Sequence, residues 1–121
     1  MIDWSLYPNF SEPEFRCRHC GVAKMEPEFL GRLQALRDVY KRPMPVTSGY
    51  RCPDHPIEKA KPEPGMHATG LAADIGVQGA DAHELMRLAF HLGFTGIGVQ
   101  QKGTGRFIHL DLRKAPMVWS Y

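Results

Sequence analysis

The sequence predicts a single α+β domain over residues 1–121, with helices packed on one face of a small, mainly antiparallel sheet. Three observations predict this fold class. Two segments repeat apolar residues at helical spacing, four shorter segments alternate as strands do, and their order along the chain suits an α+β arrangement. A chain of 121 residues has room for one ordinary hydrophobic core but not for two.

The helices are predicted from apolar stripes and from the residues that begin and end them. Ser11 and Glu14 have the spacing of a capping box, which predicts a short helix at that point. From Pro27 to about Tyr40, apolar residues fall on one helical stripe, and proline suits a first turn. A second stripe predicts a helix over residues 81–92, and Gly93 provides its stop.

Four strands are predicted from short segments of alternating character: Val46–Arg51, Ala72–Val77, Gly96–Gln100 and Phe107–Arg113. In the last segment, aliphatic residues occupy one face, while His109 and Asp111 share the other. The same rule turns Asp74 away from the core. The glycines of the third segment lie on this open side and leave room for a ligand or a close backbone. One face of the sheet therefore belongs to the core, and the other carries groups suited to a site.

The segment between Cys52 and Met66 is rich in proline and lysine. Its four prolines argue against regular structure, so we expect an irregular loop that rims the site.

Composition narrows the classes of function. Apolar residues make up 43% of the chain and charged residues 23%, as in soluble globular proteins. The net charge of +2 is scattered, which indicates no nucleic-acid partner but suits an anionic polymer. No apolar run approaches the roughly 20 residues of a membrane helix, so no membrane insertion is expected. The first residues lack the basic and apolar regions of a signal peptide, so we expect the protein to be made in the cytoplasm. We also expect a monomer.

His67, Asp74 and His109 form the strongest candidate metal site. Two imidazoles and one carboxylate leave a tetrahedral zinc ion one open position, which is the composition of a catalytic site. These ligands cancel only half of the ion's charge, so it would still polarise a carbonyl and activate bound water. Spacing alone leaves an alternative open, in which these are a loop histidine, a strand-edge carboxylate and a hydrogen-bonded histidine.

Three ordered motifs carry a family resemblance: Val46–Cys52 (Val-Thr-Ser-Gly-Tyr-Arg-Cys), His67–Ile75 (His-x2-Gly-x3-Asp-Ile) and Phe107–Arg113 (Phe-Ile-His-Leu-Asp-Leu-Arg). They resemble the M15-type D-Ala-D-Ala carboxypeptidases and endopeptidases, especially the short members encoded by phages and prophages. The resemblance extends from the first helix to the Trp119 tail. It implies the fold shared with hedgehog domains, with zinc on the sheet face away from the helices.

The resemblance also implies roles for individual residues. The family's zinc ligands correspond to His67, Asp74 and His109. Its arginine corresponds to Arg51, which would bind substrate or stabilise the oxyanion, and Ser48 in the same motif would contact substrate.

The general base of the family has no direct counterpart. Arg106 and Phe107 occupy the positions at which relatives carry an acidic residue or a histidine. Asp111 remains, and it would either activate water or orient His109 as a hydrogen-bonded carboxylate. Asp54 and Glu63 in the rim loop are weaker candidates.

The activity implied is zinc-dependent hydrolysis of a peptide bond in peptidoglycan stem peptides or cross-links. Without a signal peptide, the protein would reach the wall by phage-assisted release or as part of a virion. The alternative is an inactive zinc-containing module that binds the wall or belongs to the phage particle.

The cysteines predict a possible second metal site. Cys17 and Cys20 form a C-x2-C pair, and Cys52 and His55 would complete a closed structural zinc site. His19 is a competing fourth ligand. Three small buried residues, or one disulfide with a free thiol, are the other interpretations. A nucleic-acid zinc module is disfavoured because no basic, aromatic-rich face accompanies the pair.

Overall fold

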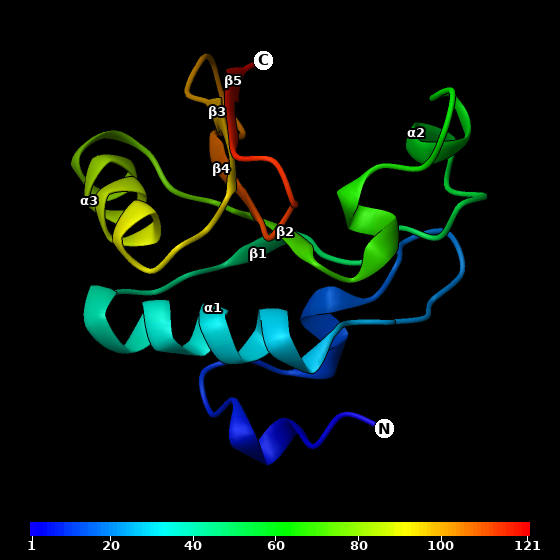
Figure 1. Ribbon diagram of the computed structural model, residues 1–121, viewed down its shortest axis with the longest axis horizontal. Helices are drawn as coiled ribbons and strands as arrows, with labels where there is room; N and C mark the ends of the chain where they lie inside the picture. Colours follow the sequence, from blue (N-terminus) through cyan, green and yellow to red (C-terminus); the bar gives the residue numbers. More distant parts are fainter.

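The computed structural model describes residues 1–121 (Figure 1). The α-helices are α1 (Pro27–Tyr40), α2 (Pro56–Lys59) and α3 (Gly79–His91). Three 3-10 helices span Trp4–Leu6, Glu12–Phe15 and Met66–Thr69. The strands are β1 (Val46–Ser48), β2 (Ala72–Ile75), β3 (Gly96–Gln100), β4 (Phe107–Asp111) and β5 (Met117–Ser120). None of the helices combines the length and apolar character needed to cross a membrane.

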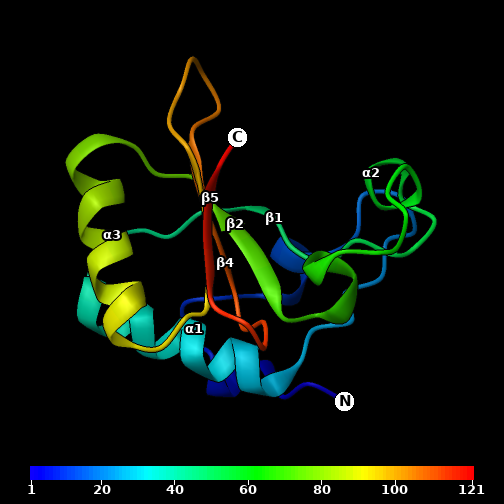
Figure 2. The ribbon, with the colours of Figure 1, turned by 45° about the horizontal axis from the view of Figure 1, so that its top comes forward.

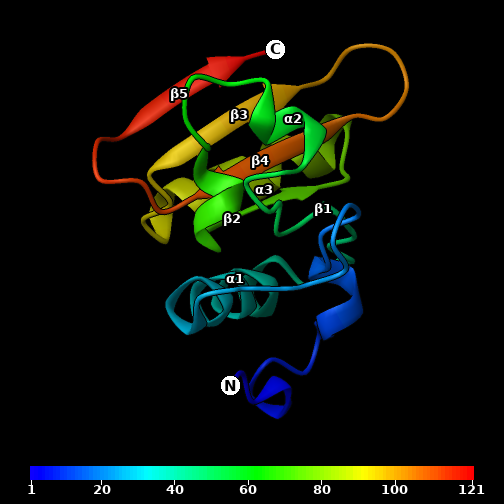
Figure 3. The same cartoon turned by 90° about the vertical axis from the view of Figure 1, so that its right-hand side faces the viewer.

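The five strands form one sheet in the order β1-β2-β4-β3-β5. The first three pairings are antiparallel, and only β5 joins β3 in parallel at the edge. Figure 2 shows the sheet nearly edge-on, with α3 on one side and α2 on the other. In Figure 3, α2 and the 3-10 helix Met66–Thr69 lie in front of the sheet and α3 lies behind it. The predicted α+β class with a mainly antiparallel sheet is confirmed.

The strand register aligns one residue from each strand in a row across the sheet. Ser48 pairs with Asp74, Asp74 with His109, His109 with Gly98, and Gly98 with Trp119. Residues opposite each other on neighbouring strands point to the same face. The row therefore gathers a hydroxyl, a carboxylate, an imidazole and an indole on the face away from α3.

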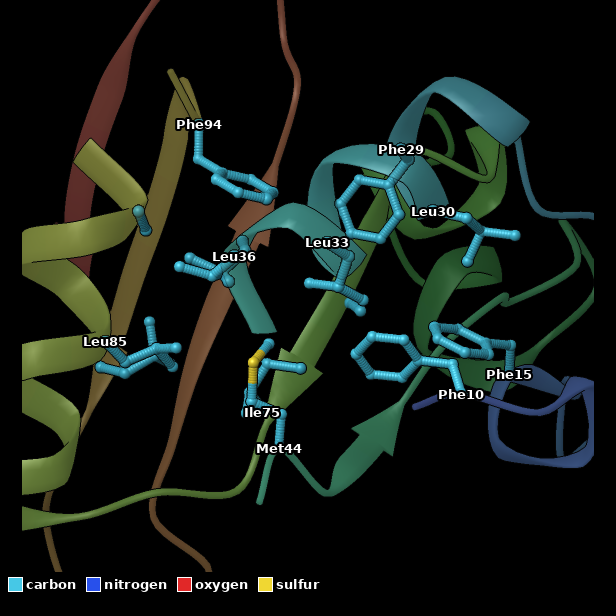
Figure 4. Packing of buried hydrophobic residues seen from close by; sticks show 14 of the residues in the cluster. Phe10, Phe15, Phe29, Leu30, Leu33, Leu36, Met44, Ile75, Leu85 and Phe94 are labelled. Carbon is cyan, nitrogen blue, oxygen red and sulfur yellow. The ribbon is translucent and has the colours of Figure 1, made fainter. Parts of the chain in front are cut away.

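The core fills the space between α1, α3 and the aliphatic face of the sheet. Figure 4 shows Leu36 of α1 beside Leu85 of α3 and Phe94, with Ile75 of β2 below them. Ile108 on β4 is also fully buried. The predicted division of the strands into a core face and a polar face is therefore correct.

Most predicted elements are present, with shorter strands than expected. Helix α1 and strand β3 have the predicted bounds, and α3 begins two residues before the expected start. Strand β1 ends at Ser48 because the following backbone bonds elsewhere. Tyr50 N–H donates to the carbonyl of Phe15 at 2.9 Å, and Arg51 N–H donates to that of His67 at 3.1 Å.

The prediction of an irregular loop over residues 52–66 is wrong in one part. Helix α2 forms within it because Pro56 occupies the first turn, where its missing N–H costs nothing. The Nδ1 atom of His55 accepts a hydrogen bond from Ile57 N–H at 3.1 Å and caps the helix. Strand β5 was not predicted at all.

Candidate metal centre and substrate cleft

Three buried side chains converge on one point of the polar sheet face. His67 comes from the 3-10 helix Met66–Thr69, Asp74 from β2 and His109 from β4. His109 Nδ1 lies 3.0 Å from Asp74 Oδ1 and 3.2 Å from His67 Nε2, which is 3.3 Å from Asp74 Oδ1. A tetrahedral zinc ion with bonds of about 2.0–2.1 Å holds its ligand atoms roughly 3.3 Å apart. The donor set and its spacing therefore fit zinc.

Hydrogen bonds on the outer side of each imidazole direct one nitrogen towards this point. His67 Nδ1 lies 2.8 Å from the carbonyl oxygen of Gly49, which can only accept. His109 Nε2 lies 2.7 Å from Oδ2 of Asp111. Each ring thus donates its N–H outwards and leaves the lone pair of the other nitrogen for a metal.

The charge of the cluster also suits a cation. Burial raises the pKa of Asp74, but the adjacent imidazoles of His109 and His67, which donate to this carboxylate when they are protonated, outweigh burial and hold the pKa well below its ordinary value. Asp74 is therefore ionised at neutral pH. Burial lowers the pKa of His109, but the contacts with Asp111 and Asp74 raise it by more, so the net pKa is above its ordinary value. Protons therefore compete with a metal for this imidazole.

Asp111 lies behind His109 rather than at the point of convergence. Its carboxylate is fully buried and accepts hydrogen bonds from His109 and from the guanidinium of Arg113, whose Nη2 lies 2.6 Å away. Gly96 on β3 makes room for it, since a side chain there would collide with the carboxylate. Of the two roles left open for Asp111, this geometry favours orienting the imidazole over activating water.

Arg51 extends beside the cluster and is held by three side chains. Its Nη2 lies 3.6 Å from Asp74 Oδ2, its Nε donates to Ser48 Oγ at 3.1 Å, and its Nη1 lies 3.4 Å from Glu58 Oε2. The structure brings Arg51 to the predicted site. It places Ser48 against the guanidinium, where the hydroxyl supports Arg51.

The comparison with protein-family models gives one match, to a model described as peptidase M15, over residues 8–111. The chain belongs to the peptidase M15 family. M15 peptidases are zinc-dependent, so membership together with the donor set gives this chain a zinc-peptidase-type function. The comparison with curated proteins finds no match.

Sequence reasoning missed one buried carboxylate of this M15 peptidase. Glu58 on α2 is fully buried and accepts hydrogen bonds from Gly65 N–H at 2.7 Å and from Lys61 Nζ at 3.1 Å. Burial raises the pKa of Glu58, but these donors lower it more, so a carboxylate faces Arg51. The available signal was Pro56 after His55, which marks a helix start whose first turn contains Glu58.

Two clefts meet at the candidate metal ligands of this M15 peptidase. The smaller, of about 390 Å³, opens over the three ligands, and Asp74 is the only carboxylate that lines it. Trp119 forms one wall, with its ring 5.0 Å from that of His109 and 4.4 Å from the guanidinium carbon of Arg113. Asp54 and Glu63, the weaker candidates for the base, are exposed and line neither cleft.

The larger cleft, of about 860 Å³, shares Arg51 and Asp74 with the smaller one. Four arginines line it: Arg16, Arg18, Arg51 and Arg106. Glu14 and Asp74 are the only carboxylates that line it, while Glu12 pairs with Arg16 and Glu58 with Arg51. Arg18 and Arg106 pair with no carboxylate and give the approach to the candidate metal ligands its unpaired positive charge.

The three cysteines form a group separate from the candidate metal ligands, and all are free thiols. The sulfur atoms of Cys17, Cys20 and Cys52 lie within 4.8 Å of one another. His55, the predicted fourth ligand, is not in this group, and its Nδ1 caps α2. The ring of His19 lies 6.4 Å from that of His55. Burial raises the pKa of the Cys17 thiol, but backbone N–H groups of its neighbours lower it more, to about 7.

Proposed function

We propose that this M15 peptidase hydrolyses a peptide bond in peptidoglycan stem peptides or cross-links, as a DD-carboxypeptidase or endopeptidase. The observation that carries the proposal is the convergence of His67, Asp74 and His109 beside the guanidinium of Arg51. Zinc bound by these ligands supplies a Lewis acid that polarises a carbonyl and lowers the pKa of bound water.

The protein's own residues would position the substrate for this chemistry. The guanidinium of Arg51 is partly exposed and would donate to the carbonyl oxygen as negative charge develops on it. Ser48 and Glu58 fix its orientation, so little reorganisation accompanies the reaction. His67 and His109 keep their ligating nitrogens free through their bonds to Gly49 and Asp111.

The charge of the larger cleft supports an anionic peptide as substrate. Arg18 and Arg106, which pair with no carboxylate, would attract the free carboxylates that peptidoglycan stem peptides carry. The motif resemblance to short phage and prophage enzymes supports delivery to the wall by phage lysis or in a virion.

A second candidate function is a zinc-containing wall-binding module without peptidase activity. One observation favours it: Asp74 is the only carboxylate that lines the cavity over the ligands. Asp111 is engaged by His109 and Arg113, and Glu58 is closed in by three donors. The usual acceptor for the proton of attacking water is therefore absent from the cavity wall.

Digestion of purified peptidoglycan separates the two functions. The zinc-loaded protein and a His67→Ala variant are incubated with the polymer, and mass spectrometry identifies released peptides. Peptides released by the wild type and not by the variant support the peptidase, and their ends identify the bond. Zinc-loaded protein that sediments with the polymer but releases nothing supports the binding module.

A further inference from the structure

The three cysteines come from distant segments of the chain and meet at one point. Cys17 and Cys20 follow the 3-10 helix Glu12–Phe15, and Cys52 directly follows Arg51. Their sulfur atoms lie within 4.8 Å of one another. A tetrahedral zinc ion with Zn–S bonds of about 2.3 Å separates its thiolates by roughly 3.8 Å. The spacing of the three sulfur atoms is therefore compatible with one shared ion.

Backbone N–H groups point at these sulfur atoms. Cys52 N–H donates to Sγ of Cys17 at 3.3 Å. The backbone N–H groups of His19 and Cys20 also bond to Cys17, and that of Asp54 bonds to Cys52. Donors in this arrangement stabilise sulfur that carries negative charge, as a metal-bound thiolate does.

The cluster adjoins the segment that carries Arg51 and orients His67. Tyr50 N–H donates to the carbonyl of Phe15 at 2.9 Å. The two segments approach so closely at Gly49 that an added Cβ would lie 2.5 Å from Cα of Phe15. The carbonyl of the same glycine accepts the hydrogen bond from His67. Whatever fixes the cysteines therefore also fixes the backbone behind the metal centre.

We propose that Cys17, Cys20 and Cys52 bind a second, structural zinc ion, with a histidine imidazole as the fourth ligand. Three thiolates and an imidazole leave no open position, which is the composition of structural rather than catalytic zinc sites. The ion ties the N-terminal segment to the end of β1 and adds its binding free energy to folding. It supports the position of Arg51, which directly precedes Cys52.

Two histidines lie at the edge of the cluster. His19 stands between the first two cysteines, and its side chain makes no hydrogen bond. His55 follows Cys52 at the spacing that separates the first pair, but binding through Nε2 would require its Nδ1 to give up the bond from Ile57. Single His19→Ala and His55→Ala variants distinguish them.

Metal analysis and cobalt spectroscopy on the full chain test this proposal. We expect two zinc ions per chain in the wild type and one in the His67→Ala variant, which keeps every cysteine. Cobalt(II) bound to the His67→Ala variant should show the near-ultraviolet sulfur-to-cobalt charge-transfer band of thiolate ligation. The band should disappear when Cys17→Ser and Cys20→Ser are added to the same background.

Because the cysteine variants alone could fail to fold, the decisive readouts come from chains with intact cysteines. Chelation should lower the unfolding temperature of the His67→Ala variant and make its three thiols reactive. A His67→Ala variant that binds no zinc, shows no charge-transfer band with cobalt(II), or contains a disulfide among its cysteines would overturn the proposal. A band that is unchanged in both histidine variants would overturn the imidazole ligand.

Discussion

Asp111 accepts a hydrogen bond from Nε2 of His109 at 2.7 Å, while Nδ1 of the same ring faces Asp74 and His67. The imidazole thus lies between the fully buried carboxylate and the predicted metal. This relationship separates the two roles that the sequence left open for Asp111, and it can be tested directly.

The substitution Asp111→Asn should weaken zinc binding by about 10- to 100-fold, because the carboxylate that fixes the tautomer of His109 is lost. Isothermal titration of the metal-free protein with zinc measures the effect. Asp54→Asn, on the exposed rim, is the matched control and should leave the affinity unchanged. If Asp111→Asn binds zinc normally but hydrolyses nothing, Asp111 acts on water rather than on His109.

The substitution Arg51→Lys should lower kcat for peptide hydrolysis by about 100-fold or more, since it removes an oriented donor to the oxyanion. Lysine retains the charge but cannot contact Ser48, Glu58 and Asp74 together. Zinc content should stay at the wild-type value. Arg87→Lys on the exposed side of α3 is the control, and an equal loss in both variants would argue against the proposed role.

Zinc binding should weaken as the pH falls, beginning above the ordinary titration range of histidine near pH 6.5. The pKa of His109 is raised, and its Nδ1 must be unprotonated to bind a metal. In the metal-free protein, the stability that depends on His109 changes with pH in the opposite direction. The stability contributed by protonated His109 is fully present below its unfolded pKa and is lost as the pH rises through the folded one.

Unfolding temperatures with and without zinc, measured from about pH 5.5 to 8.5, test this pH dependence. The stabilisation by zinc should increase across this range. A stabilisation that is independent of pH would show that His109 does not exchange its proton for the metal.

The substitution Gly96→Ala should destabilise the fold by about 1–3 kcal/mol, because the added methyl group collides with the carboxylate of Asp111. Chemical denaturation measures the change. Gly31→Ala on the exposed side of α1 is the control, since nothing lies within 4 Å of its added Cβ. That variant should gain roughly 0.5–1 kcal/mol from helix propensity. A Gly96→Ala variant that is as stable as the wild type would contradict the packing described for Asp111.

Alternation along the strands was sufficient to place Asp74 and His109 on a common face. Ile75 and Ile108 marked the core side, and both are fully buried. Alternation does not give the register between strands, which tertiary packing selects. The pairing of Asp74 with His109 across β2 and β4 was therefore visible only in the structure.

The missed elements carry weak local signals. Strand β5 contains three successive apolar residues, so its sequence does not alternate. Met117 and Val118 are exposed, and the strand is held by parallel pairing with β3. The glycines of β3 were expected to leave room for a ligand or a close backbone. At Gly98 that room is taken by the Trp119 ring, 2.7 Å from an added Cβ.

Anomalous diffraction at the zinc absorption edge, from crystals of the zinc-loaded protein, tests the central claim most directly. We expect a peak within bonding distance of His67 Nε2, Asp74 Oδ1 and His109 Nδ1. A zinc-loaded crystal with no peak at these three atoms, or with zinc bound through His109 Nε2, would contradict the metal centre described for this peptidase.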